Sequence, residues 1–248
     1  MPTFRVLDPT FPSSIARAQC ALAVMTKAPQ AGQVKTRLIP PLTPDEAAEL
    51  NKSFLRDTTS TISSAAMTNS ACGIAVYTPV GTESVYEDIL PPDFVLLPQR
   101  GENFGERLYF AAEDLFKCGF GSVCLIDSDS PTVGVGIFSR AIELLTSGGD
   151  QVVLGPSDDG GYYLIGFNKL RCELFERIDW STNVVLNQTK RSAREIGLDV
   201  KLLPSGYDVD DANSLRRLCN ELLTDTAPTN IAPHTRRLLS KLTAQKKL

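Results

Sequence analysis

Two pairs of aspartates, each with one residue between its members, follow predicted strands. Asp127 and Asp129 stand at the end of a buried apolar run, and Asp208 and Asp210 follow a later one. Two carboxylates on one side of an extended segment can bind a common hard cation. Such a cation would stabilise a diphosphate as a leaving group. The alternative is an ordinary turn or, for the second pair, a helix cap at Asp211.

A basic segment follows the first predicted strand. It contains Lys27, Gly32, Lys35 and Arg37, and it could surround a phosphate with backbone N–H groups and a bidentate guanidinium. A Walker loop is excluded, because that motif requires glycine directly before its lysine, whereas Val34 stands there. The alternative is a solvent-exposed basic loop that binds no ligand.

Two glycine-rich segments also follow predicted strands. In 155–166, adjacent glycines come after Asp158 and Asp159, which suits either close approach to a ligand or an Asp-Gly hairpin turn. The segment 99–107 opens a predicted helix, and its glycines would let a nucleotide lie close. Arg107 in that helix could bind a phosphate or pair with a nearby glutamate.

Composition narrows the chemistry. The 248 residues include a single histidine, His234, so His-based triads and His-rich zinc sites are excluded. The formal net charge of −4 argues against a nucleic-acid binder, which would present a basic face. None of the six cysteines forms a C-x-x-C pair, as expected for reduced structural thiols. No apolar run is long enough to span a membrane, and no signal-peptide pattern opens the sequence, so we expect a cytoplasmic protein.

Strand-like and helical patterns alternate along most of the chain. The strand-like runs are mostly continuous rather than alternating, which is typical of central strands covered on both faces. The spacing therefore predicts a mostly parallel sheet between helices, with one hairpin formed by 151–155 and 162–167. The other predicted strands are 20–26, 72–78, 94–98, 122–127 and 200–204, and the predicted helices start at 44, 104, 136, 183 and 211.

The same patterns predict the domain organisation. Residues 1–18 contain breaks and no periodicity, so we expect a loose N-terminal arm. Residues 19–224 form the expected nucleotide-binding domain. Residues 225–248 are expected to be a C-terminal tail, either a short peripheral helix or a frayed end.

Several of these segments, in order between residues 20 and about 215, together resemble a known family. They are Lys27-Ala-Pro with Gly32, Val34-Lys-Thr-Arg-Leu38, Gln99-Arg-Gly101 with Gly105-Glu-Arg107, Asp129-Ser-Pro131, Gly155-Pro with Asp159-Gly-Gly-Tyr-Tyr-Leu-Ile-Gly166, Trp180-Ser-Thr182 and Asp208-Val-Asp210. The chain resembles the glycosyltransferases linked to arsenosugar biosynthesis, distant relatives of the molybdenum-cofactor and phospholactate guanylyltransferases. It departs from the family pattern at Asp127, where glycine is usual, and at Asn103, where an acidic residue is common.

The resemblance implies a GT-A-like fold of the nucleotide-diphosphosugar transferase type, a three-layer α/β sandwich with a mostly parallel central sheet. It also implies a divalent cation, Mg²⁺ or Mn²⁺, with Asp129 as the central ligand and Asp208 and Asp210 as further ligands. Asp127 would then be a bystander. The residues expected to bind the nucleotide are Lys27, Gly32, Lys35, Arg37, Gln99, Gly101, Gly105 and Arg107.

Three functions are compatible with these residues. The leading hypothesis is a metal-dependent glycosyltransferase that moves a sugar from a nucleotide sugar to a small-molecule acceptor. Asp159 would be the general base, because no histidine is available. The alternative is a nucleotidyltransferase that joins a nucleoside monophosphate from a triphosphate to a phosphorylated small molecule and releases pyrophosphate. The third is a non-catalytic nucleotide-binding domain.

Overall fold

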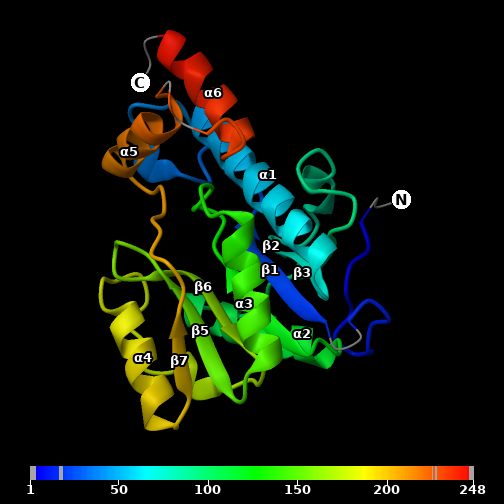
Figure 1. Ribbon diagram of the computed structural model, residues 1–248. Helices are drawn as coiled ribbons and strands as arrows, with labels where there is room; N and C mark the ends of the chain where they lie inside the picture. Colours follow the sequence, from blue (N-terminus) through cyan, green and yellow to red (C-terminus); the bar gives the residue numbers. More distant parts are fainter. Residues whose placement is uncertain (1–3, 17–18, 225, 227, 246–248) are drawn as a thin grey trace.

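The computed structural model describes residues 4–16, 19–224, 226 and 228–245, and a seven-stranded sheet runs through its centre (Figure 1). The spatial order is β3-β2-β1-β4-β6-β5-β7. Neighbouring strands are parallel except at β6, which is antiparallel to β4 and β5. The strands are β1 (Cys20–Lys27), β2 (Ala71–Thr78), β3 (Val95–Pro98), β4 (Ser122–Ile126), β5 (Gln151–Pro156), β6 (Tyr162–Phe167) and β7 (Asp199–Leu202).

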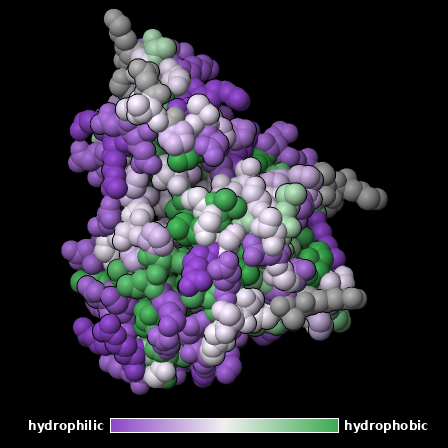
Figure 2. Space-filling view, in the orientation of Figure 1, coloured by the Kyte–Doolittle hydropathy of each residue, from purple (hydrophilic) through white to green (hydrophobic). Residues whose placement is uncertain are grey.

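Helices cover both faces of this sheet, which confirms the predicted α/β fold with a mostly parallel centre. One core cluster contains apolar residues of α1 and α3, and the cluster on the other face contains those of α2 and α4. The hydrophilic side chains of α4 and α5 dominate their part of the surface in Figure 2. The helices are α1 (Pro44–Thr68), α2 (Phe104–Lys117), α3 (Val135–Ser147), α4 (Val185–Glu195), α5 (Ala212–Leu222) and α6 (Pro233–Ala244), with short 3₁₀ turns η1 (Thr36–Leu38), η2 (Glu83–Tyr86) and η3 (Cys172–Leu174).

Local sequence signals define the element ends. The Thr43 hydroxyl accepts the Glu46 backbone N–H, and the Glu46 carboxylate accepts that of Thr43, a capping box at the start of α1. Every residue of β4 is buried, as expected for a continuous apolar run in the middle of a sheet. The chain therefore delivers Asp127 directly after β4 to the carboxyl edge of the sheet.

Residues 4–16 differ from the expected loose arm. Leu7 donates its backbone N–H to Leu96 at 2.8 Å, and Leu96 donates to Arg5 at 2.9 Å. Phe4 and Leu7 are buried. The segment thus covers the free edge of β3, and exposed strand edges in proteins are commonly protected in this way. This pairing could not be predicted, because it is too short to produce a periodic pattern.

Within the C-terminal segment, Pro233–Ala244 form the helix α6, which agrees with the expected peripheral helix. α6 packs with α1 and α5 around a third core cluster that contains Leu239 and Leu242. The carboxylate of Asp57, on α1, accepts the backbone N–H groups of His234 and Thr235 at 3.0 and 2.8 Å. This carboxylate therefore caps the first turn of α6 from a neighbouring helix. Among the described residues, we find no helix both long and apolar enough to cross a membrane.

Candidate functional site

Two adjoining pockets open at the carboxyl edge of the sheet. The first, of about 280 Å³, is the acidic pocket; the second, of about 230 Å³, is the basic pocket. Ser128, Asp129 and Asp210 line both, so these residues form the partition between them. Parallel strands direct the segments that follow them toward the same edge, which explains why residues far apart in sequence meet here.

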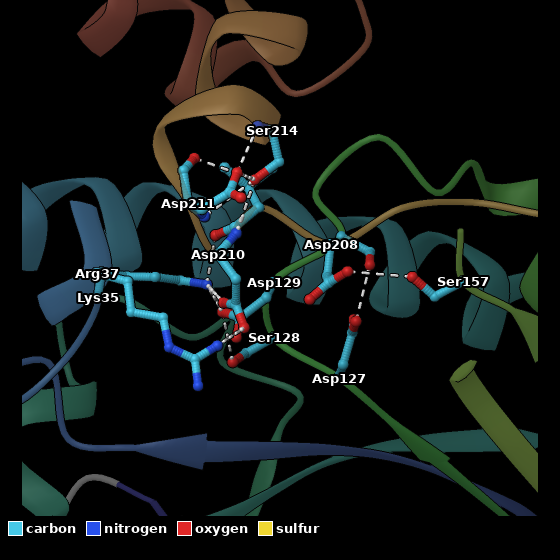
Figure 3. Close-up of polar contacts among 12 residues, drawn as sticks. Lys35, Arg37, Asp127, Ser128, Asp129, Ser157, Asp208, Asp210, Asp211 and Ser214 are labelled. Atoms are coloured by element: carbon cyan, nitrogen blue, oxygen red, sulfur yellow. Dashed lines mark hydrogen bonds and ion pairs between the residues drawn. The ribbon is translucent and has the colours of Figure 1, made fainter. Parts of the chain in front are cut away.

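Lys35 lies at this partition and binds both of its carboxylates (Figure 3). Its Nζ is 2.8 Å from Asp129 Oδ1 and 2.8 Å from Asp210 Oδ1, and it donates to the Val209 carbonyl at 2.7 Å. The Lys35 backbone has a φ of 49°, in the left-handed region, directly before η1. Burial alone would lower the pKa of Lys35, but Asp129 and Asp210 outweigh it and raise that pKa. The side chain is therefore a buried ammonium, with only 4% of its surface exposed.

The other predicted basic residues lie along the basic pocket. Lys27 and Arg37 line it together with Lys35. Arg37 is 75% exposed, and its Nη1 lies 3.8 Å from Asp210 Oδ2. Gly32 has a φ of 73°, which allows the preceding loop to turn. The basic segment thus gathers three cations on one side of the partition, as a phosphate-binding loop requires.

Asp127 reaches the acidic pocket beside Asp129. Loss of water around its carboxyl group, followed by repulsion from Asp129, raises the pKa of Asp127 well above its usual value. Ser130 Oγ donates a hydrogen bond to it at 2.7 Å.

Asp208 and Asp159 face the acidic pocket from two other segments. Ser157 Oγ donates to Asp208 Oδ1 at 3.1 Å. Burial, and then repulsion from Asp159 and Asp210, raises the pKa of Asp208. Asp159 accepts the Gly161 backbone N–H at 2.8 Å.

The loop between β5 and β6 separates its two aspartates. The Asp158 carboxylate lies 2.7 Å from Arg217 and outside both pockets, whereas Asp159 lines the acidic one. Gly160 has a φ of 89°, and a side chain there would overlap the Asn183 carbonyl. Glycine is thus required for the turn that directs Asp159 inward.

The carboxylates offer the oxygen ligands that Mg²⁺ and Mn²⁺ prefer. Within the described part of the chain, however, no three acidic, histidine or cysteine side chains converge on one point. Lys35 already engages two of the three expected ligands, Asp129 and Asp210. The donor chemistry fits a hard cation, but such a cation would have to share these carboxylates with the ammonium or displace it.

The contributors predicted between β3 and the first turns of α2 do not line either pocket. Gln99 donates its side-chain amide to the backbone carbonyls of Thr26 and Val76 at 3.0 and 2.7 Å, and so ties strand ends together. Arg107 Nε donates to the Gly101 carbonyl at 3.3 Å. Neither pocket is lined by Gln99, Gly101, Gly105 or Arg107. Their expected role in nucleotide binding stays a prediction.

An apolar wall of the acidic pocket was not predicted as part of the site. The Trp180 indole meets the Phe104 ring edge to face, with centroids 5.4 Å apart. Gly105 permits this approach, since a side chain there would overlap the indole. Tyr162 and Val185 continue the wall. Trp180 is the single tryptophan of the chain, and Trp180-Ser-Thr182 belonged to the family resemblance, but no role in the site was assigned to it.

The sequence of residues 61–182 matches a family model described as an uncharacterized protein conserved in bacteria (DUF2064). No curated protein matches the chain. The chain is 28% identical to a proposed nucleotide-diphospho-sugar transferase from Desulfovibrio desulfuricans G20, with a TM-score of 0.80 over 91% of this chain and 95% of that one.

Two more distant solved structures share the fold. One is 4-diphosphocytidyl-2C-methyl-D-erythritol synthase from Anaerococcus prevotii DSM 20548, with 13% identity and a TM-score of 0.55 over 84% of this chain and 100% of that one. The other is CMP:2-keto-3-deoxy-manno-octonic acid synthetase complexed with CTP, with 8% identity and a TM-score of 0.52 over 81% and 96%. The chain therefore has the fold of the nucleotide-diphospho-sugar transferases; the link to arsenosugar biosynthesis stays a prediction.

Proposed function

We propose that this protein is a glycosyltransferase that transfers a sugar from a nucleotide-sugar donor to a small-molecule acceptor. The observation that carries the proposal is the division of charge at the sheet edge. Cations line one pocket, carboxylates line the other, and Asp129 and Asp210 separate them. This arrangement suits a reaction in which a diphosphate binds on one side and an acceptor approaches from the other.

The donor diphosphate would lie in the basic pocket. Arg37 is exposed there and free to form a two-pronged hydrogen bond with a phosphate. Lys27 also faces this space, with its Nζ 3.5 Å from Gln33. A bound Mg²⁺ or Mn²⁺, held by Asp129 with Asp208 and Asp210, would neutralise charge on the departing diphosphate. The similarity to a proposed nucleotide-diphospho-sugar transferase supports this class of donor.

In the proposed reaction, an acceptor hydroxyl oxygen bonds to the anomeric carbon of the sugar. The bond from that carbon to the diphosphate oxygen breaks, and the nucleoside diphosphate leaves with the electron pair. Asp159 takes the hydroxyl proton. Its carboxylate lines the acidic pocket and accepts the Gly161 backbone N–H, and its second oxygen can accept a proton from the acceptor.

The alternative is nucleotidyl transfer, in which a phosphate oxygen attacks the α-phosphorus of a triphosphate and pyrophosphate leaves. Two synthetases that share the fold support this candidate, although they are under 15% identical to the chain. Both reactions develop negative charge on a diphosphate, so the same basic pocket would serve either.

The deciding experiment identifies the released product. The protein is incubated with nucleotide sugars or nucleoside triphosphates in Mg²⁺ or Mn²⁺, and nucleoside diphosphate and pyrophosphate are assayed separately. Slow hydrolysis of a nucleotide sugar to the diphosphate, absent in Asp129→Ala, supports the proposal. Pyrophosphate from a triphosphate, with every nucleotide sugar intact, favours the alternative. Binding of nucleotide without any cleavage favours a non-catalytic domain.

A further inference from the structure

The acidic pocket combines two properties that together describe a ligand. Its lining includes the apolar wall, with Trp180, Phe104 and Val185. The lining also includes carboxyl groups from three separate segments: Asp127 and Asp129, Asp159, and Asp208 with Asp210. Of the described residues that line this pocket, none is a lysine or an arginine.

The nearest cation, Lys35, offsets only part of this negative charge. Lys35 approaches Asp129 and Asp210 from the basic side, where its ammonium is already bound by both carboxylates and by a carbonyl. Asp159 and Asp208 instead accept from the Gly161 backbone N–H and the Ser157 hydroxyl, which carry no charge, so the ammonium leaves these two carboxylates uncompensated. A ligand in the acidic pocket thus meets both uncompensated carboxylates and an apolar surface.

We propose that the acidic pocket binds the acceptor, and that it selects an alcohol with an apolar face and without phosphate or carboxylate groups. This inference rests on the proposed function for the role of acceptor, and it adds the chemical class. A phosphate ester would bring about two negative charges against the carboxylates. An apolar ring or chain would instead cover Trp180 and Phe104, where aromatic surface stabilises it.

Glycosyl transfer and nucleotidyl transfer differ in the charge of their acceptors. A hydroxyl compound can attack a sugar carbon without carrying charge of its own. The nucleotidyl alternative requires a phosphorylated acceptor, and the lining of the acidic pocket opposes one. The cations that could bind such a phosphate line the basic pocket, which the donor would occupy.

Trp180 provides a direct measurement, because it is the only tryptophan and lies in the pocket. We would titrate the protein, in chelator-treated buffer, with phenyl glucoside and with its phosphate ester on the primary hydroxyl, and follow tryptophan emission. Phenyl glucoside should change the emission saturably. Its phosphate ester should bind about tenfold more weakly or worse, since like charges brought together oppose binding.

Matched variants test the cause of this preference. Asp159→Asn should narrow the ratio between the two affinities, because it removes one charge from the lining. Asp158→Asn is the control: its carboxylate pairs with Arg217 outside the pocket, so the ratio should stay unchanged. Equal or tighter binding of the phosphate ester overturns the proposal, and so does an emission that neither compound changes.

These outcomes are distinct from those that test the proposed function. Binding is measured without donor or turnover, so a protein that never cleaves a nucleotide sugar can still discriminate between the two compounds. Conversely, tight binding of the phosphate ester would exclude the proposed class of acceptor, an alcohol without phosphate groups. The protein could still release nucleoside diphosphate from a nucleotide sugar.

Discussion

The ammonium of Lys35 lies 2.8 Å from a carboxylate oxygen of Asp129. Lys35 comes from the basic segment after β1, whereas Asp129 follows β4, so this ion pair joins the two halves of the site. Asp210 binds the same ammonium from the segment after β7. The lysine expected to meet a phosphate therefore also neutralises the carboxylates expected to hold a cation.

Replacing Lys35 by methionine should have two measurable effects. Removing a buried charge partner leaves Asp129 and Asp210 repelling each other, which should lower the unfolding free energy by about 1–3 kcal/mol, allowing for their partial exposure. The free protein should also bind Mn²⁺ more tightly, because the ammonium no longer competes. Chemical denaturation and titration calorimetry measure these effects. Lys27→Met, at an exposed lysine of the same pocket, should change neither.

Asp129→Ala should weaken the binding of Mn²⁺, whereas Lys35→Met should strengthen it. If Asp129 is the central ligand, Mn²⁺ should no longer raise the melting temperature of the variant in the presence of a nucleoside diphosphate. If Mn²⁺ raises the melting temperature of the variant as much as that of the natural protein, Asp129 is not a ligand of the cation.

Arg37→Ala should weaken binding of a nucleoside diphosphate about tenfold, since a hydrogen bond to a charged group contributes about 1.5–3 kcal/mol. The melting temperature of the free protein should hardly change, because the side chain is 75% exposed. Arg216→Ala is a suitable control, since Arg216 contacts Asn213 on the surface of α5. If calorimetry shows that Arg37→Ala binds the nucleoside diphosphate with full affinity, the Arg37 side chain does not contact the phosphates.

Asp159→Asn keeps the shape of the side chain and removes its basicity. If Asp159 accepts the proton of the acceptor, turnover should fall about a hundredfold or more, while affinity for donor and metal is retained. Asp158→Asn, one position earlier in the loop, should keep full turnover. Loss of donor or metal affinity in the Asp159 variant would indicate a ligand role instead.

Asp211 should make stability depend on pH. Its carboxylate accepts the backbone N–H groups of Ser214 and Asn213 at 2.8 and 2.9 Å, at the start of α5. The Ser214 N–H contributes most to lowering the pKa of Asp211 below its ordinary 3.8. A lowered folded-state pKa adds stability that is present above the ordinary value and is lost as the pH falls through the lowered one.

Asp211→Asn retains the cap but not the charge. The stability deficit of this variant relative to the natural protein should therefore be present near neutral pH and should disappear in acid, as the pH falls through the lowered pKa of Asp211. Asp211→Ala should be destabilised by about 1 kcal/mol near neutral pH, because the cap itself is lost. Urea denaturation at several pH values measures both, and a deficit of the asparagine variant that does not depend on pH would contradict the account.

The fold was accessible from sequence because strand–helix alternation and continuous apolar runs are local signals. β4 and the β5–β6 hairpin lie where the pattern placed them. The carboxyl-edge rule also brought Asp129, Asp208 and Asp210 to one edge.

The unpredicted features depend on contacts between distant segments. The Lys35–Asp129 pair requires a left-handed backbone at a residue that is not glycine, which no spacing indicates. Gln99 was expected to bind nucleotide, yet its amide satisfies carbonyls at two strand ends. Trp180 lies between β6 and α4 in a segment without periodicity, so its packing against Phe104 could not be inferred.

The third core cluster has a consequence for the order of folding. It contains Leu38, which is next to Arg37, and Val209, which lies between Asp208 and Asp210 in the sequence. Apolar residues of α6 belong to the same cluster. Contacts between positions so far apart in sequence form only after the intervening chain is ordered. During refolding we therefore expect helical structure to recover before nucleotide affinity, with a lag while the two ends of the binding edge come together.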